Sequence, residues 1–238
     1  MRAFQRSGPF NIENVSQAPK LPGVYVWYAR FAVGEADWHS EYAGGEDKAA
    51  EYLMKALKDQ SLKFARQEMK IAAAANFSSE WHGTLREDPS ARWGITPSDQ
   101  INPDGFDDRL HECLRNDITR QGLVDLVDHA FPLFSAPLYV GKAAEQTLRD
   151  RLRQHRWNYL HLWERSVNDS QFPERLKAPK NFAERAIKLG FTPEDLYCFT
   201  LSFDATSVDE LTAEDGIALI EATEWILNRW ATPILGRQ

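Results

Sequence analysis

Apolar residues recur along the chain with two different spacings, and the shorter runs predict strands. Pro22-Gly23 opens a run of aromatic and β-branched residues, LPGVYVWYARFAV (21–33), of the kind that strands favour. Two further runs, APLYVGKA (136–143) and LYCFTLSF (196–203), have the same character. We therefore predict three strands, and we expect the mixed, polar residues 1–20 to form a short lead-in to the first of them.

Helical spacing fills most of the remaining sequence. Between Asp47 and about Asn76, apolar residues recur at intervals that place them on one helix face. Similar patterns predict helices over 107–129, 145–165, 174–189 and 212–230. Gly, Pro, Ser and Asn residues break the pattern over 78–106, which predicts an irregular connection. The order of these elements is not a regular β/α alternation, so it predicts an α+β fold with a small mixed sheet and helices packed on it.

The spacing of the strands predicts an interrupted domain. Residues 31–136 lie between the first two predicted strands and carry two helical patterns, so we expect a large, mostly helical insertion there. Residues 1–30 would supply an N-terminal arm and the first strand of the main domain, and 137–238 the remainder. Substrate recognition, dimerisation and a lid are the three roles open to the insertion, and with them a homodimer stays open.

Composition limits the classes of protein that fit this pattern. With 43% hydrophobic and 26% charged residues, the chain of 238 residues is typical of a globular protein rather than a disordered or collagen-like one. Two cysteines, Cys113 and Cys198, are too few for a disulfide framework or a thiolate metal cluster. The apolar runs are too short to cross a bilayer, and the first residues lack the apolar stretch of a secretory signal. We therefore expect a cytoplasmic protein without a membrane partner.

The charge distribution is more informative than the total charge. A net charge of −7 taken alone argues against a nucleic-acid partner, which usually meets a basic surface. Binding depends on a local patch, however, and residues 142–165 carry six Lys or Arg against three Asp or Glu. Arg149, Arg153 and Arg156 recur there at helical spacing and predict a basic stripe on one side of a helix. Such a stripe is either a solvated face or the surface that a DNA backbone needs.

Two tripeptides and a set of polar residues follow one another in a recognisable order. In chain order they are GVY (23–25), YVG (139–141), Lys142, Arg151, His155, Glu224 and Pro233. Each tripeptide alone would be common in any strand. The ordered set resembles the GIY-YIG nuclease family over 21–30 and 137–238. The histidine four residues after the arginine most resembles the type II restriction-enzyme branch of that family.

Arg151 and His155 project from one face of their predicted helix, because they are four residues apart. Leu148, Leu152 and Tyr159 share that face, which indicates that it points towards the core. A cation and an imidazole at the edge of a buried face are costly unless they have partners. Two interpretations stay open at this point: a structural salt bridge, and a site that binds phosphate.

The last predicted helix distinguishes two glutamates. At about 100° per residue, one arc of the helix collects Ile217, Leu219, Ile220, Ile226, Leu227 and Trp230. Glu224 falls inside this arc, whereas Glu221 falls outside it and is expected to face solvent. A carboxylate within an apolar arc needs a counter-charge, a metal ion or a proton. The resemblance, through the distance of nine residues to Pro233, implies that Glu224 binds one divalent ion, Mg²⁺ or Mn²⁺.

The resemblance also implies roles for the other site residues in phosphodiester hydrolysis. Arg151 would hold the scissile phosphate. Tyr25, assisted by His155 or Lys142, would act as general base on the attacking water, and Tyr139 would orient the phosphate or the water. Which of the two tyrosines is the base stays open. The basic stripe would contact backbone phosphates of the DNA.

We therefore expect a metal-dependent DNA endonuclease, with restriction or another form of anti-phage defence as a fitting role. Two features depart from the family pattern: the length of the insertion at 31–136, and Gly236 in place of the usual Asn after the final proline. One alternative is a catalytically silent DNA-binding or scaffold protein on the same fold. The other is a helical interaction protein in which the motif matches are accidental.

Overall fold

Two stretches of chain that are distant in sequence fold together. In the computed structural model, Met1–Ala32 and Asp128–Gln238 form one compact unit, and Val33–Val127 forms a second. The structure describes residues 3–31, 33, 39, 48–65, 68–74, 80–86, 110, 112–176, 179–208, 211–231 and 233–235. The second unit covers most of the expected insertion, and the first unit contains every candidate site residue.

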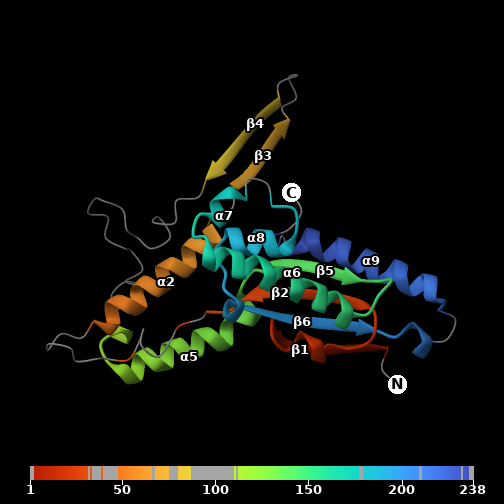
Figure 1. Cartoon of the computed structure of the whole chain (residues 1–238), viewed down its shortest axis with the longest axis horizontal. Helices are drawn as coiled ribbons and strands as arrows, with labels where there is room; N and C mark the ends of the chain where they lie inside the picture. Colours follow the sequence, from red (N-terminus) through yellow and green to blue (C-terminus); the bar gives the residue numbers. More distant parts are fainter. Residues whose placement is uncertain are drawn as a thin grey trace. The chain divides into compact units, whose positions relative to one another are not determined.

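The first unit is built on a four-stranded antiparallel sheet (Figure 1). In the spatial order β1-β6-β2-β5, its strands are β1 (Phe4–Asn11), β6 (Leu196–Phe203), β2 (Gly23–Ala29) and β5 (Tyr139–Ala143). The structure confirms a fold that combines helices with strands. It corrects the expected mixed, three-stranded sheet, because every pairing in this sheet is antiparallel and β1 adds a fourth strand from the lead-in at 1–20.

β1 was missed because its sequence, FQRSGPFN, lacks the apolar alternation of a half-buried strand. Most of its side chains are exposed, and Phe10 is its one buried residue. Its pairing with β6 shifts register between Ser7 and Phe10, around Gly8-Pro9. Proline cannot donate to a ladder, so a polar strand with a proline at an irregularity is typical of a sheet edge. Backbone pairing, which hydrophobic patterns do not report, holds this strand in place.

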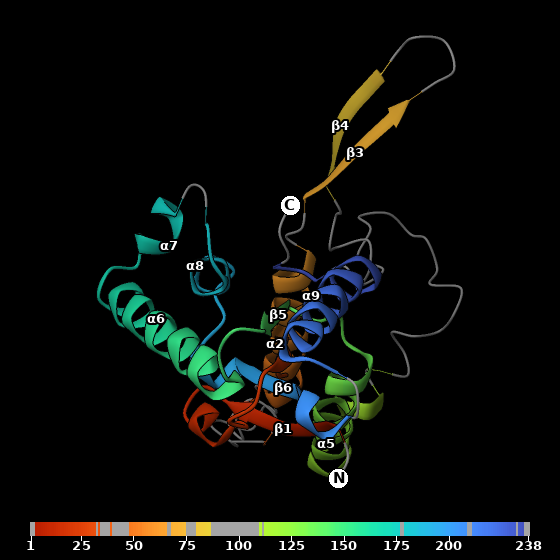
Figure 2. The same ribbon diagram turned by 90° about the vertical axis from the view of Figure 1, so that its right-hand side faces the viewer.

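Helices cover both faces of this sheet (Figure 2). On one face lie α6 (Leu148–Asn168), α7 (Phe172–Arg175) and α8 (Phe182–Lys188), and on the other lies α9 (Ala213–Trp230). Alternate residues of β2 serve the two faces. Trp27 stacks on Phe182 of α8 with ring centroids 5.1 Å apart. Val24, on the opposite face, packs with Phe203 and with Ile220 of α9.

Three helices of this unit, α6, α8 and α9, begin at residues whose side chains cap them. The hydroxyl of Thr147 accepts a hydrogen bond from the first turn of α6, and Thr212 forms a capping box at the start of α9. The single helix expected over 174–189 is two helices instead. Pro179 lies between them, where proline and the residue before it disfavour helix. The second of the two, α8, begins after its own cap, Asn181.

The second unit combines helices with a two-stranded hairpin that the sequence pattern does not predict. It contains α2 (Ala49–Ala65), β3 (Glu68–Ala74), β4 (Glu80–Arg86) and most of α5 (Asp117–Phe134). The helix expected over 47–76 therefore ends early, and a strand occupies the start of the stretch expected to be irregular. β3 is rich in helix formers, so its strand conformation depends on pairing with β4, which local propensity does not report. The residues after Arg86 in that stretch lie outside the described residues.

Helix α9 buries fewer of its apolar side chains than its apolar arc predicts. On α9, Ile220 is 4% exposed, but Leu219 is 46% exposed and Trp230 is 81% exposed. Two of the six residues in the expected apolar arc therefore face solvent, because the sheet contacts one side of the arc. Among the residues that the structure describes, no helix has both the length and the apolar character needed to cross a bilayer.

Neighbouring residues of α9 should differ in their contribution to stability. Ile220→Ala removes a buried side chain from the contact with Val24 and Phe203, and should lower the free energy of unfolding by about 2–5 kcal/mol. Leu219→Ala truncates a half-exposed side chain and should cost less than about 1 kcal/mol. Urea unfolding of the two variants measures the difference. Equal losses would contradict the register of α9 on the sheet.

Candidate active site

Tyr25 and His155 form a buried hydrogen bond between the sheet and α6. The Tyr25 hydroxyl lies 2.6 Å from Nε2 of His155, and the two residues are 1% and 8% exposed. When the hydroxyl donates to Nε2, the ring proton of the neutral imidazole is on Nδ1. The structure thus joins the tyrosine of the first tripeptide to the histidine of the following helix.

Gly141 makes room for the Tyr25 ring. The two residues are directly paired between β2 and β5, and the Tyr25 side chain lies on the face that α6 covers, where it meets His155. A Cβ atom at position 141 would overlap the Tyr25 ring at Cζ and the hydroxyl oxygen, and would lie 2.8 Å from Cε1 of Tyr139. The missing side chain therefore lets the tyrosine extend across the edge strand. This gives the glycine of the YVG tripeptide a steric role in the site.

Two further rings, those of Tyr139 and Phe182, enclose the pair. The His155 ring lies 6.0 Å from the Tyr139 ring and 5.5 Å from the Phe182 ring, edge to face in both cases. Burial, and after it the positive charge of Arg151, lower the pKa of His155 to about 3. Burial, reinforced by Tyr139 and opposed by Arg151, raises the pKa of Tyr25. Both groups are therefore neutral near pH 7, which avoids the cost of burying an ion.

Arg151 supplies a positive charge beside this neutral pair. Its Nη1 donates to Oε1 of Gln154 at 3.1 Å, and Gln154 in turn donates to Gln146 at 3.0 Å. Its Nε is buried and has no hydrogen-bond partner. Among the described residues, no carboxylate forms an ion pair with Arg151, so the salt-bridge interpretation finds no partner there. A guanidinium with an unsatisfied donor is well suited to an anionic ligand.

Lys142 lies on the opposite face of the sheet from Tyr25. It pairs with Val24 in the β2–β5 register, and its Nζ forms an ion pair with Oε1 of Glu221 at 2.6 Å. Glu221, expected to face solvent, contacts the sheet in this way while its side chain remains 51% exposed. Of the two groups expected to assist Tyr25, His155 is the one that contacts the hydroxyl.

Glu224 is half-buried on α9 and hydrogen-bonded within its own helix. Its Oε1 accepts a hydrogen bond from Nδ2 of Asn228 at 2.7 Å. No hydrogen bond or ion pair of the described residues joins Glu224 to Tyr25, His155 or Arg151. These residues also contain no group of three or more His, Cys, Asp or Glu side chains able to hold a metal ion. A single carboxylate still fits Mg²⁺, which binds through one or two carboxylates, waters and substrate phosphates.

The expected arginine stripe divides into two parts. Arg149 is half-buried, and its Nε donates to the backbone carbonyl of Ala18 at 2.8 Å, which ties α6 to the segment before β2. Arg149 therefore makes a structural contact through its Nε, and its contact with a DNA backbone stays a prediction. Arg153 and Arg156 are exposed, as a solvent-facing stripe requires.

Two contributors to the site were absent from the set expected from the sequence. Gln154 orients Arg151 and follows it by three residues, a helical spacing that was available as a signal. Phe182 packs against His155 from α8. No local sequence pattern connects His155 with Phe182, so only the folded structure reveals this contact.

Comparisons with known proteins do not assign this chain to a family. No protein-family model matches the sequence, and no curated protein or solved structure matches the chain. The resemblance to GIY-YIG nucleases therefore consists of the order of short motifs along the sequence.

Gly141→Ala should destabilise the protein, because the added methyl group meets the Tyr25 ring. Overpacking of this kind lowers the free energy of unfolding by about 1–3 kcal/mol. Gly122→Ala on α5 is the matched control, since a Cβ there meets no atom within 4 Å. In the middle of a helix that change should stabilise by about 0.5–1 kcal/mol. Denaturant unfolding of both variants checks the contrast, and a tolerated Gly141→Ala would refute the steric role.

His155 should make the protein sensitive to acid. Its pKa falls from 6.5 in the unfolded chain to about 3 in the folded protein, so the unfolded chain binds the extra proton between these values. Its contribution to stability is complete above pH 6.5 and is lost as the pH falls towards 3, by up to about 1.4 kcal/mol per pH unit. His155→Asn should flatten the slope of unfolding free energy against pH in this window. Equal slopes in the two proteins would argue against a neutral, buried imidazole.

Proposed function

We propose that this protein is a metal-dependent DNA endonuclease of the GIY-YIG type that hydrolyses phosphodiester bonds. The observation that carries the proposal is the position of Arg151, which has no carboxylate partner among the described residues, beside a buried tyrosine–histidine pair. A phosphodiester would give the guanidinium an anion through charge-assisted hydrogen bonds. It would also bring the phosphorus atom close to the Tyr25 hydroxyl, a group able to transfer protons.

Tyr25 and His155 act in this proposal as a proton relay. Because burial raises the pKa of Tyr25, the tyrosine is protonated in the free protein and is not a base by itself. Its proton passes to Nε2 of His155, 2.6 Å away, while the phenolic oxygen accepts a proton from the attacking water. A bound phosphate adds negative charge near the imidazole, which raises its pKa and favours this transfer. Tyr139 packs against both rings and would orient the water or the phosphate.

Glu224 is the residue that would hold Mg²⁺ or Mn²⁺. Asn228 fixes one of its carboxylate oxygens, and the other has no hydrogen-bond partner among the described residues. When bound, the ion supplies Lewis-acid stabilisation of the charge on the phosphate and on the leaving 3′-oxygen. Because one carboxylate makes a weak site, we expect metal affinity to depend on the phosphate oxygens of the substrate as well.

A catalytically silent DNA-binding protein on the same scaffold is the second candidate. It is favoured by the placement of Glu224, which shares no hydrogen bond or ion pair with Tyr25, His155 or Arg151 in the described part of the chain. Both candidates place a phosphate at Arg151, so DNA binding does not distinguish them and cleavage does. For an active nuclease, we propose restriction or another form of anti-phage defence as the biological role.

The purified protein should nick or cut DNA in the presence of Mg²⁺, and chelation should abolish the reaction. Tyr25→Phe keeps the ring but removes the hydroxyl, and should slow cleavage by about 10²–10⁴-fold with DNA binding preserved. Relaxation of supercoiled plasmid, digestion of phage DNA and cutting of branched oligonucleotides are the measurements. If all three substrates stay intact with both Mg²⁺ and Mn²⁺, the nuclease is rejected in favour of the silent DNA-binding protein.

Substitution of the two glutamates of α9 should distinguish the loss of a metal ligand from the loss of a surface charge. Glu224→Gln keeps the shape of the side chain and should bind DNA without cutting it. Glu221→Gln, the matched control, weakens a half-exposed ion pair with Lys142 that contributes at most about 1 kcal/mol, so it should keep cleavage within a few-fold. Cleavage rates are compared at equal folded fraction, checked by thermal melts. Loss of activity in Glu221→Gln together with retention in Glu224→Gln would show that Glu224 is not the metal ligand.

A further inference from the structure

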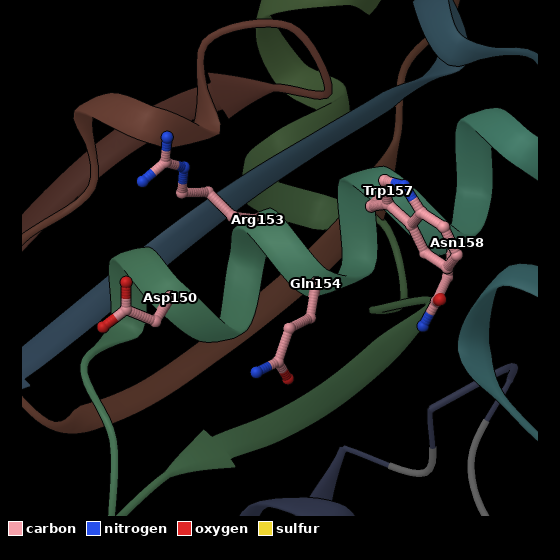
Figure 3. A pocket seen from close by; sticks show the side chains of 5 residues that line it. All are labelled: Asp150, Arg153, Gln154, Trp157 and Asn158. Atoms are coloured by element: carbon pink, nitrogen blue, oxygen red, sulfur yellow. The ribbon is translucent and has the colours of Figure 1, made fainter.

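An open pocket of about 590 Å³ lies along α6, on the side of the helix next to Arg151. Its lining residues are Asp150, Arg153, Gln154, Trp157 and Asn158. Figure 3 shows their side chains projecting from successive turns of the helix. Apart from Arg153 in the basic stripe and Gln154, which orients Arg151, none of them has a role in the proposed function, although the pocket shares a helix with Arg151 and His155.

One hydrogen bond connects the pocket to the candidate active site. Oε1 of Gln154, which lines the pocket, accepts from Nη1 of Arg151 at 3.1 Å. At about 100° per residue, the positions around the helix run in one direction from Arg151 through Gln154 to Trp157. A DNA strand with a phosphate on Arg151 would therefore have the pocket beside its next nucleotide.

Trp157 offers a flat ring for stacking. The residue is 69% exposed. Its indole is nearly parallel to the ring of His161, one turn further along α6, with centroids 5.7 Å apart and an interplanar angle of 6°. The imidazole of His161 thus lies beside one side of the indole. Exposed aromatic rings are the platforms on which nucleic-acid bases stack.

The amide groups within one turn of the indole suit a base better than a phosphate. Gln154 and Asn158 carry amides, which pair with the edges of bases. Asp150 lies at the other end of the pocket, about two helical turns from Trp157, and its carboxylate accepts a hydrogen bond from the Thr147 hydroxyl at 2.7 Å. Arg153 supplies a cation for the adjoining backbone. The pocket therefore combines stacking, hydrogen bonding to base edges and a charge for the strand that carries the base.

We propose that this pocket binds an unpaired nucleobase next to the scissile phosphate. The preferred substrate class is then DNA with a single-stranded or unstacked nucleotide at the cleavage site. In a regular duplex, neighbouring bases cover each face, so an unstacked base is needed to meet Trp157. The assignment of the scissile phosphate to Arg151 rests on the proposed nuclease function. Exposed tryptophans also anchor protein–protein contacts, and that occupant is an outcome of the test.

Fluorescence of 2-aminopurine in the DNA tests this pocket, because the eight tryptophans of the chain do not contribute to its signal. Binding is measured in EDTA, which prevents cleavage, with the probe either in a single-stranded gap or paired in a duplex of the same sequence. The wild-type protein should change the fluorescence of the unpaired probe more strongly. Trp157→Ala should lose this response and bind gapped DNA about tenfold more weakly, whereas Trp157→Phe should retain most of both. Trp230→Ala is the matched control, since it removes a tryptophan that is 81% exposed on α9, and should behave as the wild type.

The outcomes separate this inference from the proposed function. The base pocket is overturned if the paired and unpaired probes respond alike, or if Trp157→Ala leaves binding and response unchanged, even where Mg²⁺-dependent cleavage occurs. It is also overturned if Trp157→Ala alters self-association in size-exclusion chromatography but not DNA binding, because Trp157 then anchors a protein. A response that depends on Trp157, without cleavage in Mg²⁺ or Mn²⁺, supports the pocket and rejects the nuclease.

Discussion

The hydrogen bond between Tyr25 and His155 depends on the absence of a side chain at Gly141. The β2–β5 register places the glycine directly beside Tyr25, and a Cβ atom there would overlap the tyrosine ring. Once the ring lies across the edge strand, its hydroxyl reaches α6 and meets Nε2 of His155. Arg151 projects from the helix one turn earlier. The position of Tyr25 relative to the two helix residues therefore depends on the space that Gly141 leaves free.

The electrostatic arrangement divides the site into a neutral interior and a charged rim. Tyr25 and His155 are buried but uncharged, so the sheet and α6 can pack around them without the penalty of desolvating an ion. The permanent charge of Arg151 lies beside them, and part of its guanidinium has no hydrogen-bond partner. A chain with a net charge of −7 can in this way present a local positive potential, because an arginine acts over a few ångströms and the acidic surplus is spread over the sequence.

The sequence was most informative where one local rule determined the structure. The run LYCFTLSF coincides with β6, and Thr147 and Thr212 mark the starts of α6 and α9. Helical spacing also placed Arg151 and His155 together, as the structure has them. β1 and β3 were missed because their conformation depends on partner strands: FQRSGPFN has no alternating pattern, and EMKIAAA alternates only over its first four residues and is rich in helix formers.

For Lys142 and Arg149, the structure shows contacts that a hydrophobic pattern predicts only in part. Strand alternation places Lys142 on the opposite face from Gly141 and hence from Tyr25, which the sequence could have indicated. The ion pair of Lys142 with Glu221 could not be anticipated, because it depends on where α9 lies on the sheet. The same holds for Arg149, whose partner is a backbone carbonyl of Ala18 in a distant segment. Contacts between elements, rather than the elements themselves, were the missing information.

The close approach of Gly141 to Tyr25 makes the two positions epistatic. A larger residue at 141 is most harmful while the tyrosine is present, and of the three nearest contacts of the new Cβ a small residue at position 25 would leave only that with Cε1 of Tyr139, at 2.8 Å. The order of substitutions in a lineage is then constrained, because replacing the glycine first passes through a strained intermediate. A descendant that has dispensed with this site would lose the tyrosine before the glycine. A homologue with the glycine but no tyrosine would accordingly preserve a trace of an ancestral site.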